Sequence, residues 1–411
     1  MRVTASAPGK LVLLGEYAVL EGAPALVLAV NRRARVMLRA GESPSNPIAR
    51  HPGESRDPVT FAQSTEMQRH WVPDIASRLR LQDCKRERRG RREARAPWTA
   101  RVFRDDEKNQ GFVDSDGWEI VSPTLGLQAR LQLQDCNATW IDVAPAELEW
   151  IATLLARFPP SGRLPAGRIE LDSDAFYLDH EGTREKLGLG SSAALTVALL
   201  GALHALANLA PPTLGEAIEA HRAIQHGHGS GIDIAASLTG GLSRFQLDDS
   251  AKTVPIALPD NLRWVCVYSG RPASTSAMLT TVAAWREREP TAFTQYMHEL
   301  ATISSRGIDA LTANDAAAFL SSLHDYATAL ARFGAAAGAD IASHEHRAIA
   351  AIAADCGCVY KSCGAGGGDV GVTFAVEYTR LRAFSERASR AGFPVIGLEA
   401  DPKGLEVVSN V

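Results

Sequence analysis

The sequence predicts an α+β protein of two domains, and three observations support this class. The first 40 residues alternate short apolar runs with turns that contain Pro and Gly, which is typical of an antiparallel sheet and not of a β-α-β unit. The region after Pro255 shows an alternation of helices and strands of its own. A chain of 411 residues is long enough for two or three domains. We therefore expect one domain over residues 1–255 and a second over residues 256–411.

The individual elements follow from apolar periodicity and from turn residues. The first sheet is expected to use strands at residues 2–5, 11–14, 25–30 and 35–38, with turns at Pro8-Gly9 and Gly22-Ala23-Pro24. Later strands are expected at residues 118–121, 168–171, 264–268, 370–376 and 395–398. Helices are expected at residues 146–158, from residue 192 onward, at 214–225, within 277–330 with breaks, at 345–355 and at 379–391.

A basic segment interrupts the first domain. Apolar periodicity is lost between residues 41 and 116, and residues 78–104 hold eleven Lys or Arg against three Asp or Glu. Such a charge run is usually solvated. A nucleic-acid-binding arm is the alternative, but few aromatic residues lie among the arginines. We expect an insert at about residues 43–112, in a connection of the sheet and at the protein surface.

Composition excludes several classes of protein. Lys and Arg number 43 and Asp and Glu 47, so the net charge is −4, whereas nucleic-acid-binding proteins usually present a basic face. Hydrophobic residues make up 45% and charged residues 22%, which excludes wholesale disorder and a collagen-like chain. Six cysteines are too few for a disulfide framework. Cys356, Cys358 and Cys363 lie close together, but no Cys-x-x-Cys or histidine pair completes a tetrahedral zinc site.

The sequence favours a soluble, cytoplasmic protein with no membrane partner. Its first ten residues lack the apolar region of a signal peptide. The most apolar stretch, residues 193–210, contains His204 and Asn208 and is about 18 residues long, at the lower limit for a bilayer span. Because this stretch begins after Gly-Ser-Ser, we interpret it as a buried helix.

The segment Lys186-Leu-Gly-Leu-Gly-Ser-Ser-Ala-Ala194 opens this apolar helix. Glycines let a backbone turn tightly and approach a ligand, and the start of a helix has unpaired N–H groups that suit a phosphate. Ser191 and Ser192 are placed to cap the helix, to contact phosphate or to bind Mg²⁺. The alternative is an ordinary serine-capped helix after a glycine turn.

A second glycine-rich segment, Lys361-Ser-Cys-Gly-Ala-Gly-Gly-Gly-Asp369, has four glycines in five positions. Glycine loses more backbone entropy on folding than other residues, so this density favours close approach to a ligand. A flexible linker is the alternative reading. The order expected on both sides of the segment disfavours it.

Two charged residues stand beside small residues. Asp233 follows Gly229-Ser230-Gly231-Ile232 and leads an apolar run, and the alternative to a functional role is a helix N-cap. Lys10 leads into an apolar strand, where a buried ammonium needs a partner. The alternative for Lys10 is an exposed lysine on an edge strand.

Together these elements resemble the GHMP kinase superfamily. Its first motif is matched by Pro8-Gly9-Lys10 through Gly15-Glu16-Tyr17-Ala18-Val19-Leu20, its second by residues 188–194 and its third by residues 364–369, all in the family order. The resemblance covers about residues 1–40 and 117–400. It implies an N-terminal domain like the second domain of ribosomal protein S5, a ferredoxin-like C-terminal domain and an active site between them.

Several details are most similar to bacterial and fungal phosphomevalonate kinases. Tyr17 stands where mevalonate kinases usually carry His, and Lys186 precedes the glycine turn. The segments that follow the phosphomevalonate kinase pattern are Ala220-His221 through residues 229–233, residues 269–276 and residues 361–369. Arg222 stands where mevalonate kinases have a metal-binding Glu. The resemblance implies ATP-dependent phosphorylation of mevalonate 5-phosphate to mevalonate 5-diphosphate in isoprenoid biosynthesis, by a monomer or homodimer. The alternatives are a mevalonate kinase or another sugar or alcohol kinase of the superfamily and, from a different class, an inactive nucleotide- or nucleic-acid-binding protein.

The resemblance also implies roles for single residues. Asp233 would be the base or would orient the acceptor, and Lys10 would keep Asp233 ionised and stabilise the transferring phosphoryl group. The residues expected at ATP are Lys186, Gly188, Leu189, Gly190, Ser191, Ser192 and Ala193, with Ser191 or Ser192 at Mg²⁺. Those expected at the acceptor are Glu16, Tyr17, Ser230, Gly231, Arg271, Ser274, Lys361, Ser362, Gly364, Ala365, Gly366, Gly367 and Asp369. Lys186, Arg271 and Ser274 are the candidates for the acceptor phosphate.

Overall fold

A computed structural model describes residues 1–41, 117–134, 137–157, 166–180, 182–225, 227–248 and 250–410, which belong to one compact unit. The insert expected at about residues 43–112 lies outside the described residues. The mixture of sheets and helices confirms the α+β class. No helix among the described residues is both long and apolar enough to cross a membrane.

The larger sheet has nine strands and is built around two long ones, β1 (Arg2–Leu14) and β2 (Ala25–Ala40). Its main path runs β10-β9-β2-β6-β3-β4-β5, and β1 pairs with β2 and β15. All its pairs are antiparallel except β3 with β6. The other strands are β3 (Trp118–Ser122), β4 (Leu127–Gln134), β5 (Asn137–Trp140), β6 (Gly167–Asp172), β9 (Leu242–Leu247), β10 (Ala251–Ile256) and β15 (Glu406–Asn410). A separate hairpin joins β7 (Tyr177–His180) to β8 (Thr183–Lys186).

The turn expected at Pro8-Gly9 is wrong, because β1 continues through these residues as an irregular strand. The pairing register with β2 shifts between Pro8 and Gly9, and such irregularities are where strands tolerate proline. A Cβ at Gly9 would lie 2.8 Å from the carbonyl oxygen of Leu189. The next residue, Lys10, donates its backbone N–H to that same oxygen at 2.9 Å. The irregularity therefore brings the first motif against the second.

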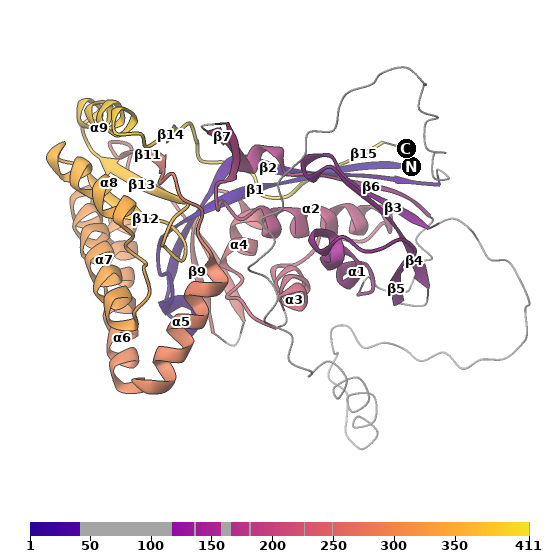
Figure 1. Cartoon of the computed structure of the whole chain (residues 1–411), viewed down its shortest axis with the longest axis horizontal. Coiled ribbons are helices and arrows are strands. Elements are labelled where there is room, and N and C mark those ends of the chain that lie inside the picture. The colour runs from indigo at the N-terminus through magenta and orange to yellow at the C-terminus, as the bar shows by residue number, and fades with distance from the viewer. Residues whose placement is uncertain are drawn as a thin grey trace, which may run out of the picture. The chain divides into compact units, whose positions relative to one another are not determined.

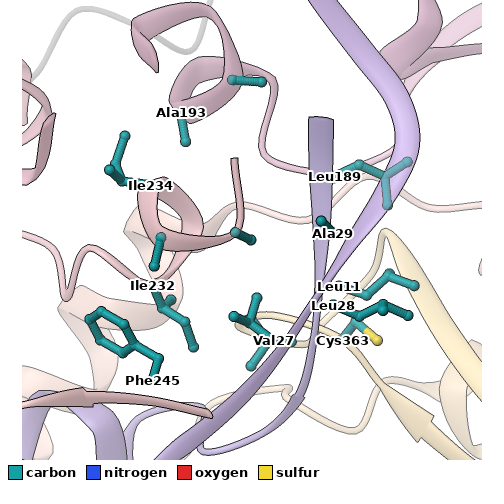
Figure 2. Close-up of a cluster of buried hydrophobic side chains, with 14 of the residues drawn as sticks. Leu11, Val27, Leu28, Ala29, Leu189, Ala193, Ile232, Ile234, Phe245 and Cys363 are labelled. Atoms are coloured by element: carbon teal, nitrogen blue, oxygen red, sulfur yellow. The ribbon is translucent and has the colours of Figure 1, made fainter. Parts of the chain in front are cut away.

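Helices cover this sheet, and the most apolar of them is the helix expected from residue 192. α2 (Ser191–Leu206) contacts β1, β2 and β15, and also contacts α3 (Leu214–Ile224) and α4 (Ile232–Thr239). Such contacts on several sides explain why α2 is apolar around its whole circumference. Figure 2 shows side chains of β1 and β2 gathered with those of α2 and α4 in this core. The helix expected at residues 146–158 is shorter, with α1 at Glu149–Leu155.

The second sheet has four antiparallel strands in the order β12-β13-β11-β14. Figure 1 shows the later helices beside it. The strands are β11 (Arg263–Tyr268), β12 (Val359–Ser362), β13 (Val370–Ala375) and β14 (Val395–Ile396). The helices are α5 (Thr275–Arg288), α6 (Pro290–Thr312), α7 (Ala316–Ala337), α8 (His344–Asp355) and α9 (Tyr378–Arg390). The sequence missed β12, whose last two residues, Lys361 and Ser362, it placed in the glycine-rich segment.

The chain returns to the first sheet at its end. β15 pairs with β1, with Arg2 opposite Asn410, so the two ends of the described chain lie side by side (Figure 1). Pro255, at the expected domain boundary, lies within β10. The division at residue 255 stays a prediction.

Arg33 of β2 fastens this returning segment. Its guanidinium donates to Asp401 Oδ2 at 2.7 Å, to the Gly404 carbonyl at 2.6 Å and to the Ser6 carbonyl at 3.0 Å. The side chain of Arg33 is 16% exposed and that of Asp401 9%. One planar group with five donors thus joins β1, β2 and the C-terminal segment.

We expect Arg33→Met to lower the free energy of unfolding by roughly 2–4 kcal/mol, because Asp401 and two carbonyl groups lose their donor in a largely buried place. Chemical denaturation measures this change. The control is Arg35→Met, on the same strand but exposed, which should change stability by less than about 0.5 kcal/mol. Equal effects of the two substitutions would contradict the assignment.

A buried ion pair joins the two sheets beneath the motifs. Lys361 of β12 has a side chain with no exposed surface, and its Nζ pairs with Oε1 of Glu16, which follows β1. Nζ also donates to the Ser362 carbonyl at 2.7 Å. Burial raises the pKa of the Glu16 carboxyl, and the Lys361 ammonium opposes that effect. The centre of the Tyr326 ring lies 5.6 Å from Nζ of Lys361. The hydroxyl of Tyr326 donates to the Glu16 carbonyl at 2.8 Å.

Removing one partner should cost far more than removing both. We expect Lys361→Met to lower the free energy of unfolding by about 3–5 kcal/mol, because Glu16 is left buried without its cation. Adding Glu16→Gln should recover part of this loss, so the double variant should be more stable than the sum of the single changes. Urea denaturation of the two single variants and the double variant measures the coupling. Strictly additive losses would show that the pair does not act as a unit.

Candidate active site

A pocket lies where the three motifs and the segment before α4 meet. From the first motif it is lined by Lys10, Val12, Glu16, Tyr17, Val19 and Leu20, and from the second by Gly188. From α3, the segment that follows it and the start of α4 come His221, Gln225, Gly229, Ser230, Gly231, Ile232 and Asp233. From the second sheet and α5 come Thr275, Leu279, Cys363, Gly364, Ala365, Gly366 and Asp369.

Lys10 and Asp233 form an ion pair at this pocket, with 3.5 Å between Nζ and Oδ1. Lys10 lies inside the paired strand β1 and is only 7% exposed, so the alternative of an exposed edge lysine is wrong. The alternative of Asp233 as an N-cap is also wrong. α4 begins at Ile232 after Gly231, which has φ 85°, and Asp233 is the second residue of the helix. The residue at the N-cap is therefore Gly231, whose left-handed conformation favours glycine. The carboxylate of Asp233 does not cap the helix and pairs with Lys10 instead.

The glycines of the second motif are required by neighbouring side chains. A Cβ at Gly190 would lie 3.1 Å from Cε of Lys10, and a Cβ at Gly188 would overlap Oδ2 of Asp369. Because the same Gly190 position lies 3.6 Å from Asp233 Oδ2, the two carboxylates flank this turn. The turn therefore places an ammonium and two carboxylates beside the start of α2.

The two serines of the turn have different surroundings. α2 begins at Ser191 after Gly190, and no side chain caps it, so the alternative of a serine-capped helix is wrong. Ser191 is buried, whereas Ser192 is exposed and its Oγ lies 3.4 Å from Nε2 of His221. The first intrahelical bond runs from the Ala194 N–H to the Gly190 carbonyl. The N–H groups before it have no acceptor within the helix.

The third motif is held in place by hydrogen bonds from several elements. Tyr17 Oη donates to the Ala365 carbonyl at 2.7 Å, and the Gly367 N–H donates to the Ile341 carbonyl at 2.8 Å. Asp369 has φ 58°, unusual for a residue other than glycine, and its Oδ1 accepts the Ala273 N–H at 3.0 Å. Burial raises the pKa of Asp369, although Lys10 and Lys186 oppose this. A segment held by this many hydrogen bonds is not a flexible linker, so that alternative is wrong.

Several residues expected at the ligands do not line the pocket. Lys361 lies beneath it in the buried pair with Glu16. Arg271 is exposed and pairs with Asp340 at 3.3 Å and Glu345 at 3.6 Å. Ser274 caps α5 by accepting the Ala277 N–H. The others that do not line the pocket are Lys186, Leu189, Gly190, Ser191, Ser192, Ala193, Ser362 and Gly367.

Some pocket residues were given no role by the sequence. His221 of α3 lines the pocket with its Nε2 3.4 Å from Ser192 Oγ, and burial lowers its pKa while Asp233 opposes this. His221 belongs to a stretch, from Ala220 to Asp233, that follows the phosphomevalonate kinase pattern, but the resemblance gave His221 no role. Val12 could have been found, because side chains two residues apart on a strand share a face with one another and Lys10 was already suspected. Leu20 and Leu279 come from segments far apart in sequence.

Known proteins resemble this chain in sequence and in fold. Residues 152–241 match the family model of the GHMP kinases N terminal domain. A phosphomevalonate kinase of Streptomyces sp. (strain CL190) is 25% identical over 392 residues, which cover 89% of this chain and 88% of that protein.

Solved structures show the same fold. The Lin0012 protein of Listeria innocua has a TM-score of 0.72 at 18% identity, with complete coverage of both chains. Streptococcus pneumoniae phosphomevalonate kinase, in complex with phosphomevalonate and AMPPNP, has a TM-score of 0.65 at 16% identity, covering 97% of this chain and 99% of that chain. L. major mevalonate kinase, in complex with R-mevalonate, has a TM-score of 0.57 at 17% identity and covers 97% and 96%. The motifs, the family-model match over residues 152–241 and the fold shared with these solved kinases make this chain similar to the GHMP kinases.

Proposed function

We propose that the chain phosphorylates mevalonate 5-phosphate with ATP to give mevalonate 5-diphosphate. The observation that carries a kinase reaction is the Lys10–Asp233 pair beside the start of α2. The phosphomevalonate kinase relative supports the choice of acceptor. Phosphoryl transfer depends mainly on positioning and on neutralising charge, and this pocket offers both.

The triphosphate would lie at the turn of residues 188–192. Backbone N–H groups at the start of α2 suit phosphate oxygens, and Lys10 supplies a nearby positive charge. A phosphate oxygen of the acceptor would attack the γ-phosphorus, and the bond from that phosphorus to the oxygen shared with the β-phosphate would break, so that ADP leaves and the acceptor becomes a diphosphate. Asp233 would orient the acceptor phosphate, or take the proton from it when it is protonated. Lys10 would stabilise the charge on the transferring group.

The oxygen donors at the turn fit Mg²⁺, the cation expected with ATP. Ser192 and the carboxylates of Asp233 and Asp369 surround this turn, and hydroxyl and carboxylate oxygens suit a hard cation. Ser192 is the better candidate, because Ser191 is buried. The described residues contain no group of three His, Cys, Asp or Glu placed to hold a metal alone. Mg²⁺ bound here would therefore be shared with the phosphates and would neutralise part of their charge.

A second candidate function has a specific observation in its favour. Among the described residues that line the pocket, Lys10 is the one Lys or Arg, and Arg271 is engaged with Asp340 and Glu345 outside it. A phosphorylated acceptor needs more positive charge than this. Mevalonate or another alcohol without a phosphate is therefore the alternative acceptor.

An acceptor panel separates the two functions. We expect ADP release to be fastest with mevalonate 5-phosphate, with Arg271 leaving its carboxylate partners to meet the acceptor phosphate. Coupled ADP-release assays with mevalonate 5-phosphate, mevalonate, homoserine and galactose give kcat/KM for each. A higher kcat/KM for mevalonate would overturn the preferred acceptor but leave the kinase reaction standing. If none of the four compounds supports ADP release, this group of acceptors is rejected.

Asp233→Asn keeps the shape of the side chain and removes its charge and basicity. We expect kcat to fall by roughly 10²–10⁴ with ATP binding little changed. Lys10→Met should also lower kcat, and the double variant should lose less than the product of the two single losses, because the pair acts together. Steady-state kinetics and melting temperatures of each variant measure this.

The matched control is Asp309→Asn, an exposed aspartate of α6. It should keep normal kcat and stability. Normal turnover in Asp233→Asn, under conditions where the wild type is active, would remove Asp233 from the reaction.

A further inference from the structure

A buried histidine contacts the third motif without lining the pocket. His346 is the third residue of α8 and is 3% exposed. Its Nε2 lies 2.9 Å from the carbonyl oxygen of Gly368, and its Nδ1 lies 2.7 Å from the hydroxyl of Tyr360 on β12. His346 does not line the pocket, and neither the motifs nor the expected site residues include it.

The two contacts fix which nitrogen of His346 carries hydrogen. A carbonyl oxygen only accepts, so Nε2 must donate to Gly368, and Nδ1 of the neutral ring then accepts from the Tyr360 hydroxyl. Burial lowers the pKa of His346, which favours the neutral ring. Glu345 and Asp340 act against this shift, and Lys361 acts with it.

The peptide between Gly368 and Asp369 is thereby held at both of its polar groups. His346 donates to the carbonyl oxygen of Gly368, and the N–H of Asp369 donates to the Arg271 carbonyl at 2.7 Å. Asp369 follows with φ 58°, a conformation that residues other than glycine adopt rarely unless their surroundings impose it. Its carboxylate rests against Gly188 of the second motif.

We propose that His346 is a positioning residue for the transfer reaction: it holds the Gly368 carbonyl and so keeps the Asp369 carboxylate against the turn where the triphosphate would lie. This rests on the proposed kinase function. Without the Nε2 donor, the peptide keeps the hydrogen bond from its N–H to Arg271 but is no longer held at its carbonyl oxygen. Asp369 can then relax toward a negative φ, which would move its carboxylate away from Gly188. Misplacement by about 1 Å near reacting groups can cost about 10² in rate.

Three variants separate positioning from plain stability. His346→Leu removes the donor, and His346→Gln keeps an amide N–H able to reach an acceptor. Phe384→Leu is the stability control, because Phe384 is fully buried in the same core cluster as Tyr360 but is on α9, away from the third motif. We expect kcat to fall about 10- to 100-fold in His346→Leu, with partial recovery in His346→Gln and wild-type kcat in Phe384→Leu. KM for ATP should change by less than about threefold, because the start of α2 is untouched.

Hydrogen exchange gives a readout that does not need an acceptor. Amides of residues 364–370 should exchange faster in His346→Leu than in the wild type, and at the wild-type rate in Phe384→Leu. If no acceptor is turned over by the wild type, the kinase proposal fails, and this exchange pattern alone decides whether His346 holds the segment. Unchanged exchange in His346→Leu, or a kcat that falls equally in Phe384→Leu, would overturn the proposal.

Discussion

The buried pair between Glu16 and Lys361 is the interaction on which the rest of the site depends. It joins the end of β1 to β12, so it ties the first motif to the strand that leads into the third. Neither charge can be left alone in this place, because an unpaired buried charge costs several kcal/mol. The need to keep the two charges together therefore restricts how the two sheets can be arranged. With that arrangement fixed, the Tyr17 hydroxyl reaches the Ala365 carbonyl, and both residues line the pocket.

Glycine has a consistent physical role at this site. Gly9, Gly188 and Gly190 each stand where a Cβ would collide with or crowd another motif. The sequence suggested that the glycines make room for a ligand, and the structure shows that they also make room for Lys10 and Asp369. Close approach of backbone and side chain is what brings one ammonium and two carboxylates to the start of a helix. The opposite charges then attract one another in a place that is partly closed to water, where the attraction is stronger than in bulk solvent.

Much of the fold was predictable, because its elements follow local patterns. The buried helix after residue 190, the helices of the second half and the strand at Val370–Ala375 all come from apolar periodicity and glycine boundaries. The failures have local causes too. Pro8-Gly9 has the composition of a turn, but pairing with β2 on a long strand outweighs it. β12 is too short to show a period, and its Lys361 is polar because it meets Glu16 and not because it faces water.

The sequence by itself determined the α+β class and the three motifs, which depend on residue type and spacing and are displayed by a single chain. The resemblance that these motifs carry implied that Lys10 and Asp233 act together. Only the tertiary structure decided that Asp233 does not cap its helix, that Lys361 lies beneath the pocket and that His346 holds Gly368. The partners in each case are separated by tens or hundreds of residues, and whether a charged side chain meets a partner, water or a ligand is set by packing between elements. No local pattern carries that information.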